Sequence, residues 1–250
     1  MTEATPLFRL RIRFNKFGKV RFTSHRDVAR IWERALRRAQ FPLAYTEGFS
    51  PRPKLSFGLA LSTGYESLGE YLDVALRRDD VELEQLPTLL DPVLPVGIEV
   101  QASVRLPAGA ESLQSAVTSC TWRVELRGTA AADAQQAVAQ ALDATELVVS
   151  RERKGREVSE DIRPGILALR VLEVGEVHAD AGDGTWLETE LATQPRSLRP
   201  AELVDALDST MNVGKVVRME QWTQAGGARQ EVIPLPSAAT LARTRQARAS

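Results

Sequence analysis

The first side chains with recognisable chemistry stand together at Ser24, His25 and Arg26. Ser24 precedes Asp27 by three residues, a spacing typical of a capped helix start, where a hydroxyl and an acid each satisfy a backbone N–H. The N–H groups left free in the first turn favour an anion such as phosphate. His25 could serve there as a general base, or it could be a buried structural histidine, because its helical angle points toward the apolar side. We take His25 as the candidate catalytic residue, and Ser24 and Arg26 as candidate phosphate ligands.

The same helix, predicted to run to about residue 40, carries a stripe of arginines. One side presents Arg26, Arg30, Arg34, Arg37 and Arg38, and the other presents Val28, Ile31, Trp32, Ala35, Leu36 and Ala39. Charged residues cover the solvent side of any amphipathic helix, so solvation alone could explain the stripe. Five arginines without a lysine nevertheless favour phosphate binding, because a guanidinium group chelates phosphate in a planar fork. The sequence therefore predicts that this stripe contacts phosphate groups.

A second candidate site is the stretch 48–54, where two prolines and a glycine exclude regular helix. It offers the ring of Phe49 and the cations of Arg52 and Lys54 on a stiff frame. Such a loop can be a mere connection between strands, but a stiff charged loop is also a common way to position a binding group. We interpret Phe49, Arg52 and Lys54 as binding residues. We expect the loop to fold over the helix start and to form one anion pocket with it.

The remaining reactive side chains complete no catalytic constellation. Glu70 and Asp73 are interpreted as outward-facing strand residues, with acids of a site as the alternative, and Cys120 and His178 as structural or incidental. No serine with its histidine and acid, no metal-ligand spacing and no nucleotide-binding glycine loop can be assembled. We expect neither a metal nor a cofactor.

An α+β fold is needed to position these residues. Strand and helix periodicities predict strands at 9–14 and 19–22, which form a hairpin or one bulged strand, followed by the helix at 24–40. Further strands are predicted at 55–60, 69–76 and 98–106, with a helix at 81–90 between the last two. After a linker at 107–110 a similar order returns, with a strand at 116–126, a helix at 130–142, strands within 147–191, a helix at 200–207 and a strand at 215–222. We predict two tandem ferredoxin-like (βαββαβ) modules with antiparallel sheets, at 1–106 and 111–223, and a flexible tail at 224–250.

Positive charge and aromatic rings are concentrated near the N-terminus. Residues 1–58 contain thirteen Lys and Arg against four Asp and Glu, although the whole chain has a formal net charge of −1. Eleven of the fourteen Phe, Tyr and Trp residues lie within 1–75. Interleaved cations and rings suit nucleic acid better than a small acidic metabolite, and nothing in the pattern indicates a preference for DNA.

The composition is that of an ordinary globular protein, with 43% hydrophobic and 26% charged residues. No run approaches the roughly 20 apolar residues that span a bilayer, and residues 1–4 do not resemble a secretion signal. We therefore expect a cytoplasmic protein without membrane contact. The single cysteine, Cys120, cannot form an internal disulfide, a thiolate zinc site or the three-cysteine cluster of a radical enzyme.

Four segments together resemble the radical-SAM-linked protein family, a bacterial domain of unknown function that occurs alone or fused behind a cobalamin-binding radical SAM protein. The matching segments are residues 16–27, 37–39, 45–54 and 69–73. The resemblance implies a radical SAM protein as a partner, and radical SAM enzymes often modify RNA. Because this chain lacks a cysteine cluster, we do not expect radical catalysis by the chain itself.

The leading expectation is an accessory protein that binds RNA, or presents an RNA substrate to a radical SAM partner, without catalysis of its own. A first alternative is a metal-independent endoribonuclease or RNA-modifying subunit that uses His25, by analogy with CRISPR-repeat-processing nucleases built from tandem ferredoxin-like modules. A second alternative is a protein–protein adaptor whose arginine helix meets an acidic partner.

Overall fold

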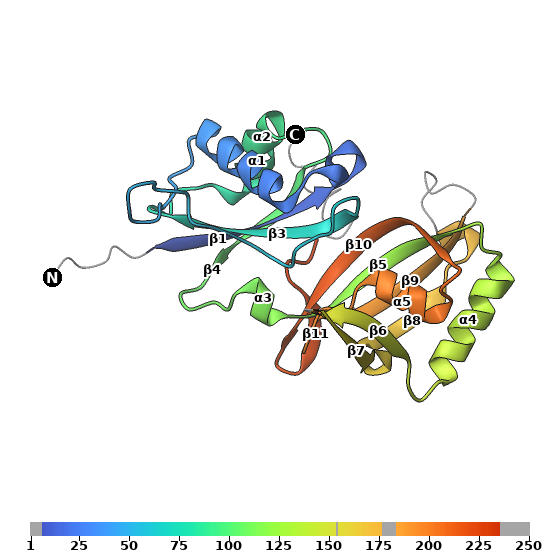
Figure 1. The fold of residues 1–250 in the computed structure, drawn as a ribbon. Coiled ribbons are helices and arrows are strands. Elements are labelled where there is room, and N and C mark those ends of the chain that lie inside the picture. Colours follow the sequence, from blue (N-terminus) through green and yellow to red (C-terminus); the bar gives the residue numbers. More distant parts are fainter. Residues whose placement is uncertain (1–6, 154, 177–183, 236–250) are drawn as a thin grey trace.

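The computed structural model describes residues 7–153, 155–176 and 184–235 (Figure 1). The N-terminal half comprises β1 (Phe8–Lys16), α1 (His25–Arg38), β2 (Leu55–Phe57), β3 (Glu66–Leu76), α2 (Leu86–Leu90) and β4 (Val100–Leu106). The C-terminal half comprises α3 (Leu113–Ala116), β5 (Val117–Arg127), α4 (Ala131–Asp143), β6 (Val148–Arg153), β7 (Arg156–Asp161), β8 (Ile166–Val171), β9 (Thr185–Ala192), α5 (Pro200–Leu207), β10 (Asn212–Ala225) and β11 (Ala228–Glu231). Short 3-10 turns lie between several of these elements.

The strands form one mostly antiparallel nine-stranded sheet and a separate β6-β7 hairpin. The main path through the sheet is β4-β1-β3-β10-β5-β9-β8, while β2 pairs with β3 and β11 pairs with β10. Helices α1 and α2 lie over the N-terminal strands, and α4 and α5 lie over the C-terminal strands (Figure 1). The predicted α+β class is therefore confirmed, whereas the division into ferredoxin-like modules stays a prediction.

Helix α1 forms where its cap and its periodicity predict it. The hydroxyl of Ser24 accepts a hydrogen bond from the backbone N–H of Asp27 at 3.3 Å and donates one to its carboxylate at 2.7 Å. The apolar side, with Val28, Trp32 and Leu36 buried, packs on the apolar face of β1. The rings of Trp32 and Phe14 lie 4.8 Å apart. This packing turns the polar side of α1 toward solvent.

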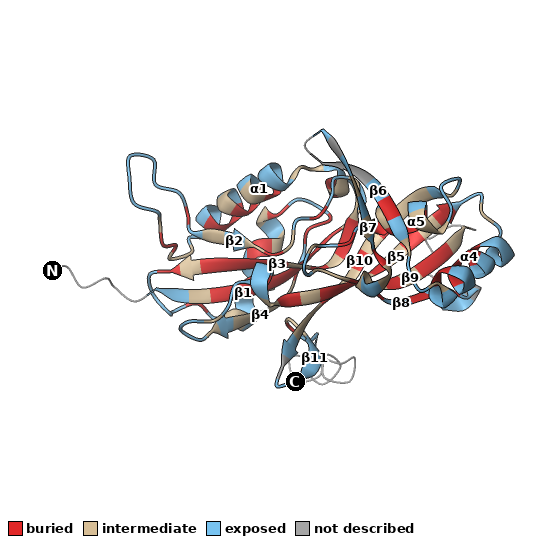
Figure 2. Cartoon of the chain, turned by 60° about the horizontal axis from the view of Figure 1, so that its bottom comes forward, coloured by how far each residue is buried: buried red, intermediate tan, exposed pale blue. Residues whose placement is uncertain are grey.

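The two halves are joined through the sheet itself. Strands β3 and β10 pair in parallel, with Glu66 opposite Val217 and Ser67 opposite Arg218. The carboxylate of Glu66 also forms ion pairs with Arg21 at 3.0 Å and Lys215 at 2.9 Å. Figure 2 shows the row of buried residues continuing from β3 into β10 and β5. The chain crosses between the halves at residues 107–109, which are exposed as expected of a linker.

Residues 19–22 are wrongly predicted as a strand, because they lie in a 3-10 helix at Gly18–Phe22. Gly18 turns the chain with φ at +66°. The carboxylate of Glu66 then accepts hydrogen bonds from the Gly18 N–H and the Arg21 side chain, both at 3.0 Å. A short alternation of cations and apolar residues also fits one 3-10 turn with Val20 buried, so the alternation alone could not distinguish the two structures.

The expected flexible tail is also wrong for its first residues. Strand β10 continues to residue 225 and pairs with β11 through a two-residue Gly226-Gly227 turn, in which both glycines have positive φ. Turns of this kind need residues that tolerate positive φ, which glycine does without steric cost. Beyond the hairpin, Ile233 is buried and its carbonyl accepts a hydrogen bond from Arg13 at 2.8 Å. Residues 236–250 and His178 lie outside the described residues.

Within the described ranges, no helix is long and apolar enough to cross a membrane.

Candidate functional site

The five arginines of α1 form one exposed surface, which we call the arginine face: Arg26, Arg30, Arg34, Arg37 and Arg38. At about 100° per residue they occupy an arc of about 120° along a helix about 21 Å long. Among the described residues only Arg30 forms an ion pair, with Asp27 at 3.0 Å, and that pair is solvent-exposed. Exposed pairs of this kind contribute little, so most of the positive charge remains available to a ligand.

Aromatic rings extend this face at both ends. Before α1, the ring of Phe22 is 61% exposed and lies 4.7 Å from the guanidinium of Arg21. After α1, the ring of Tyr45 lies between Arg37 at 5.8 Å and Arg77 at 5.6 Å. Cations next to exposed rings can hold phosphate groups and stacked bases together.

The 48–54 loop lies beside the last turn of α1, away from its first turn. Its base is closed by hydrogen bonds from Thr46 N to Arg52 O and from Lys54 N to Ala44 O, both at 2.8 Å. Phe49 at its tip is fully exposed, and Arg52 and Lys54 are also exposed. The single anion pocket expected between the helix start and this loop is therefore not assembled. The reason is the pairing of β2 with β3, which holds the loop at the far end of the helix.

His25 is exposed, so the interpretation as a buried structural histidine is wrong. Its ring packs edge-on against Phe57 at 5.2 Å. It lines a small hollow, which we call the His25 hollow, with Lys16, Glu70, Phe14, Val28, Leu59 and Leu61. Its volume of about 20 Å³ has room for about one water molecule.

Lys16 is the buried cation of the His25 hollow. Its ammonium group donates to the carbonyls of Thr23 at 3.0 Å and Arg21 at 3.3 Å. Burial lowers the pKa of Lys16, partly offset by the carboxylate of Glu70. An imidazole, an ammonium group and a carboxylate therefore line one hollow, which the sequence did not predict.

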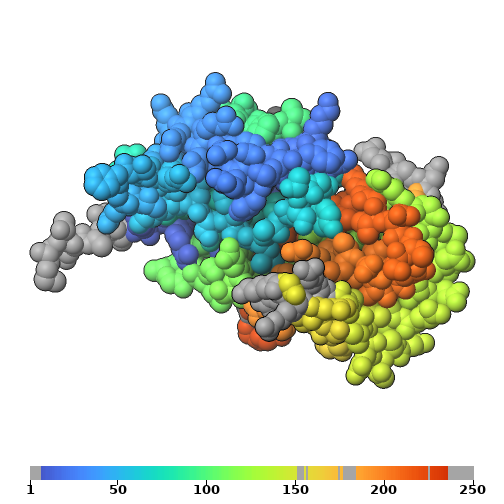
Figure 3. Space-filling model, viewed as in Figure 1, coloured from blue at the N-terminus to red at the C-terminus, as the bar shows by residue number. Residues whose placement is uncertain are grey.

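A larger cavity of about 640 Å³, which we call the cleft, opens between the two halves. It is lined by the segment Leu59, Ala60, Leu61, Ser62 and Tyr65, by Cys120 and Trp122 of β5, by Leu191 and Thr193, by Arg196, Ser197, Leu198, Arg199, Pro200 and Glu202 around the start of α5, and by Arg218 of β10. In Figure 3 the surface near residues 60–70 lies next to the surface near residue 200. Leu59 and Leu61 line both the cleft and the His25 hollow, so the two cavities adjoin.

Arg218 lies at the base of the cleft and is almost completely buried. Its guanidinium donates to Glu70, at 3.1 Å from Nε, and to the carbonyl of Leu59 at 2.9 Å. It also lies 5.3 Å from the ring of Trp122. Burial raises the pKa of the adjacent Cys120 thiol to about 11, so this thiol is protonated at neutral pH.

Sequence reasoning missed Arg218, although a signal was present. It follows Val216 by two residues and therefore faces the same way on a strand, which places an arginine at an apolar position. Glu70 and Asp73 were predicted to face outward, and this is wrong. Glu70 pairs with Arg218, and Asp73 forms a buried pair with Arg11 at 2.6 Å.

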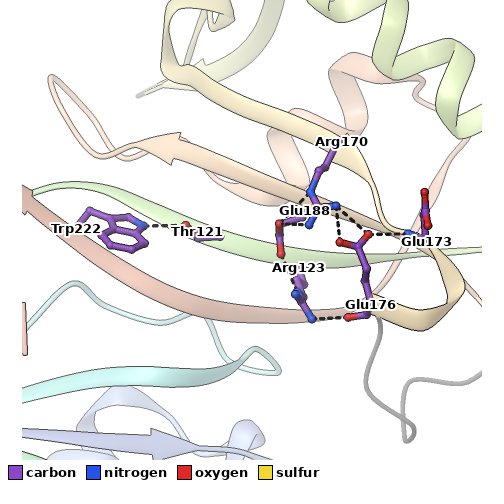
Figure 4. A network of polar contacts seen from close by, with 7 residues as sticks. All are labelled: Thr121, Arg123, Arg170, Glu173, Glu176, Glu188 and Trp222. Atoms are coloured by element: carbon purple, nitrogen blue, oxygen red, sulfur yellow. Dashed lines mark hydrogen bonds and ion pairs between the residues drawn. The ribbon is translucent and has the colours of Figure 1, made fainter. Parts of the chain in front are cut away.

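Polar side chains of the C-terminal sheet neutralise one another. Arg123 and Arg170 both pair with Glu188, and Arg170 also pairs with Glu176 (Figure 4). Nearby, the indole N–H of Trp222 donates to Thr121 at 2.8 Å. This network contrasts with the arginine face of α1, where acidic partners are scarce. In the described part of the chain, no group of three or more His, Cys, Asp and Glu is placed to hold a metal ion.

Comparison with known proteins identifies a family. Residues 9–200 match the family model DUF2344, described as an uncharacterized protein conserved in bacteria. No curated protein matches the sequence. Among solved structures, a chain of the crystal structure of a Cbf5-Nop10-Gar1 complex matches with a TM-score of 0.44 and 11% identity, over 85% of this chain and 48% of that one. This chain thus spans about half the length of the solved chain. Because the family match covers well over half of the sequence, the chain belongs to the bacterial family DUF2344.

Proposed function

We propose that this protein binds single-stranded RNA on the arginine face of α1 and presents it to a partner, without catalysis of its own. The observation that carries the proposal is that most arginines of α1 lack the ion pairs that arginines elsewhere in the protein form. Arg11, Arg123 and Arg218 each form an ion pair with a carboxylate, whereas four of the five arginines of α1 form no ion pair with a described residue. Guanidinium groups free in this way on an ordered helix suit the phosphates of a nucleic acid.

The exposed rings favour a single strand. Phe22 and Phe49 lie beyond opposite ends of α1, and stacking of an unpaired base on such a ring needs no particular sequence. A duplex would offer phosphates but no free base faces. The proposed ligand is therefore an unpaired stretch of RNA.

Two finer assignments belong to this proposal. The first is the partner, a radical SAM protein, which rests on the resemblance of residues 16–27 and 45–54 to the radical-SAM-linked family. The second is the architecture, two ferredoxin-like modules in tandem. It is supported by the strand orders β4-β1-β3-β2 and β10-β5-β9-β8, which place corresponding strands in corresponding positions.

Fluorescence anisotropy with a labelled oligouridylate tests the RNA binding. The triple variant Arg30→Gln, Arg34→Gln, Arg37→Gln keeps the length and polarity of the side chains but removes three charges. We expect it to bind RNA at least tenfold more weakly, while Arg127→Gln, an exposed arginine of the C-terminal half, serves as the matched control. Equal affinity of the wild-type protein and the triple variant would defeat the proposal. A wild-type protein that does not bind RNA but pulls down an acidic protein through α1 would instead favour the adaptor alternative.

The His25 hollow motivates a second candidate function, a metal-independent endoribonuclease. A histidine, a lysine and a glutamate line the same hollow, and histidine is the usual general base near neutral pH. Under this alternative, His25→Ala abolishes cleavage of cellular RNA but leaves RNA affinity unchanged. Under the leading proposal, neither the wild-type protein nor His25→Ala cleaves RNA.

A further inference from the structure

The cleft between the halves has the size and lining of a binding site for a small ligand. Its volume of about 640 Å³ lies within the range of roughly 300–1,000 Å³ typical of ligand pockets. Leucines 59, 61, 191 and 198 supply apolar walls, and the rings of Tyr65 and Trp122 meet edge to face at 6.1 Å. Apolar walls with aromatic rings favour a ligand that contains a planar ring.

The charges around the cleft favour an anion. Arg199 is exposed at its mouth and makes no ion pair with a described residue. Arg196 binds Glu160 and Glu202 through Nε and Nη1, but its Nη2 is buried and has no hydrogen-bond partner. A buried donor without a partner is costly, and a ligand acceptor would remove that cost.

The base of the cleft adds a further positive charge. Arg218 and the nearby Lys16 are two buried cations, and Glu70 is the carboxylate between them. The two cations are therefore only partly neutralised, and an anionic ligand above them would be electrostatically favoured. The exposed hydroxyls of Ser62 and Ser197 are further donors at the wall.

We propose that the cleft binds one ribonucleotide, with its base against Tyr65 and Trp122 and its phosphate near Arg199. The choice of a nucleotide among ring-bearing anions rests on the proposed RNA binding of α1. The His25 hollow at the first turn of α1 adjoins the cleft through Leu59 and Leu61, so the start of α1 lies close to the cleft. The nucleotide is either free or one unstacked residue of that strand.

Isothermal titration calorimetry of the full chain with the four ribonucleoside 5′-monophosphates tests the site. We expect at least one of them to bind, and Arg199→Gln and Tyr65→Ala each to weaken it about tenfold, as for the loss of one charge-assisted contact or one stacking contact. The exposed arginine in Arg127→Gln is the matched control and should leave the affinity unchanged. The α1 triple variant should also bind the monophosphate as the wild-type protein does, which separates this proposal from the binding of RNA by α1.

Competition identifies the source of the nucleotide. If the oligouridylate displaces the bound monophosphate, the cleft holds a residue of the RNA strand. If both bind at once, the cleft holds a free nucleotide. The proposal is overturned if no monophosphate binds at millimolar concentration. It is also overturned if binding is indifferent to both Arg199→Gln and Tyr65→Ala while thermal unfolding shows that these variants are folded.

Discussion

At the scale of single residues, buried arginines and surface arginines play different parts. Arg11 and Asp73 make a two-point contact, Nε to Oδ1 at 2.6 Å and Nη2 to Oδ2 at 2.9 Å, and both side chains are more than nine-tenths buried. The sequence pattern placed Asp73 on an outward face, but Arg11 also reaches the carbonyl of Glu111 at 3.3 Å, so that face is covered. Alternation along a strand shows which residues share a face of the sheet. It does not show whether a later segment of the chain covers that face.

This buried pair yields a stability prediction. Asp73→Asn leaves the guanidinium of Arg11 buried without a countercharge and should lower the free energy of unfolding by about 3–5 kcal/mol. Asp79→Asn is the matched control, because the pair of Asp79 with Arg105 is roughly two-fifths exposed and should contribute at most about 1 kcal/mol. Urea denaturation measures both. Equal small losses in the two variants would contradict the assignment of Arg11–Asp73 as a buried pair.

The exposed rings yield a binding prediction. Phe22→Ala and Phe49→Ala should each weaken the binding of single-stranded RNA by about 1–3 kcal/mol, the range for one base stacked on an aromatic ring. Neither variant removes a charge, so the salt dependence should not change. Val96→Ala, which trims an almost fully exposed apolar residue, is the control. If anisotropy titrations show wild-type affinity for both phenylalanine variants, stacking on these rings does not contribute to RNA binding.

At the scale of elements, the sequence predicted those with strong local signals. Ser24 and Asp27 predict the start of α1, and the spacing of its apolar residues predicts its length. Pro200, at the first turn, predicts the start of α5. The second predicted helix is shorter than expected, since the stretch before α2 is a 3-10 turn and Pro87 stands at the beginning of α2. A proline lacks an N–H to donate and is tolerated only near such a start.

The cleft and the position of the 48–54 loop could not be predicted in this way. The cleft is built from segments near residues 60, 120, 191, 198 and 218, and the first of these joins the others because β3 pairs with β10. Neither a local hydrophobic period nor a sequence motif predicts the pairing of β3 with β10. The loop was expected over the start of α1, but the register of β2 on β3 decides its place. The arginine face was predictable because it lies on one helix with one period.

The β10-β11 hairpin gives a prediction at this scale. Arg13 is buried and pairs with Glu220 and Glu231, both at 3.0 Å, and with the carbonyl of Ile233 at 2.8 Å. A chain ending at Ala225 keeps Glu220 but loses the other two partners, so its free energy of unfolding should be lower by about 1.5–3 kcal/mol than that of a chain ending at Leu235. Chemical denaturation of the two truncated chains checks this. Equal stability would mean that the residues after 225 do not hold Arg13 in place.

At the scale of the whole molecule, Glu66 links the two halves. Burial works to raise the pKa of Glu66, but the hydrogen bonds from Lys215, the Gly18 N–H and Arg21 outweigh it and hold the pKa below its ordinary value of about 4.5. A carboxyl whose pKa is lowered on folding stabilises the fold fully above the unfolded-state pKa. That contribution is lost as the pH falls through the folded-state pKa.

We therefore expect Glu66→Gln to lower the thermal midpoint by a constant amount near neutral pH. The difference from the wild-type protein should shrink steadily as the pH falls below about 4.5. Glu82→Gln, at an exposed position, should leave the midpoint unchanged over the same range. Differential scanning calorimetry across pH measures the midpoints. A difference that grows toward acid pH would contradict the role of Glu66 as an ionised link between the halves.

The formal charge of the whole molecule does not by itself favour the proposed binding of RNA. The net charge of −1 arises because residues 59–250 contain nineteen Lys and Arg against twenty-nine Asp and Glu, which offsets the basic N-terminal region. The excess of acidic residues lies outside α1. In the C-terminal sheet, acidic side chains form ion pairs with arginines of the same sheet. A local concentration of unpaired guanidinium groups can attract a polyanion even when the net charge is slightly negative.

The salt dependence of RNA affinity tests the central claim most directly. Each phosphate contact that is lost lowers the slope of log affinity against log salt by about 0.7 for a single strand. We predict that the triple variant Arg30→Gln, Arg34→Gln, Arg37→Gln has a slope smaller in magnitude than that of the wild-type protein by about 2, while Arg127→Gln keeps the wild-type slope. A wild-type affinity that does not depend on salt, or a slope that the triple substitution leaves unchanged, would contradict the claim that α1 binds RNA phosphates.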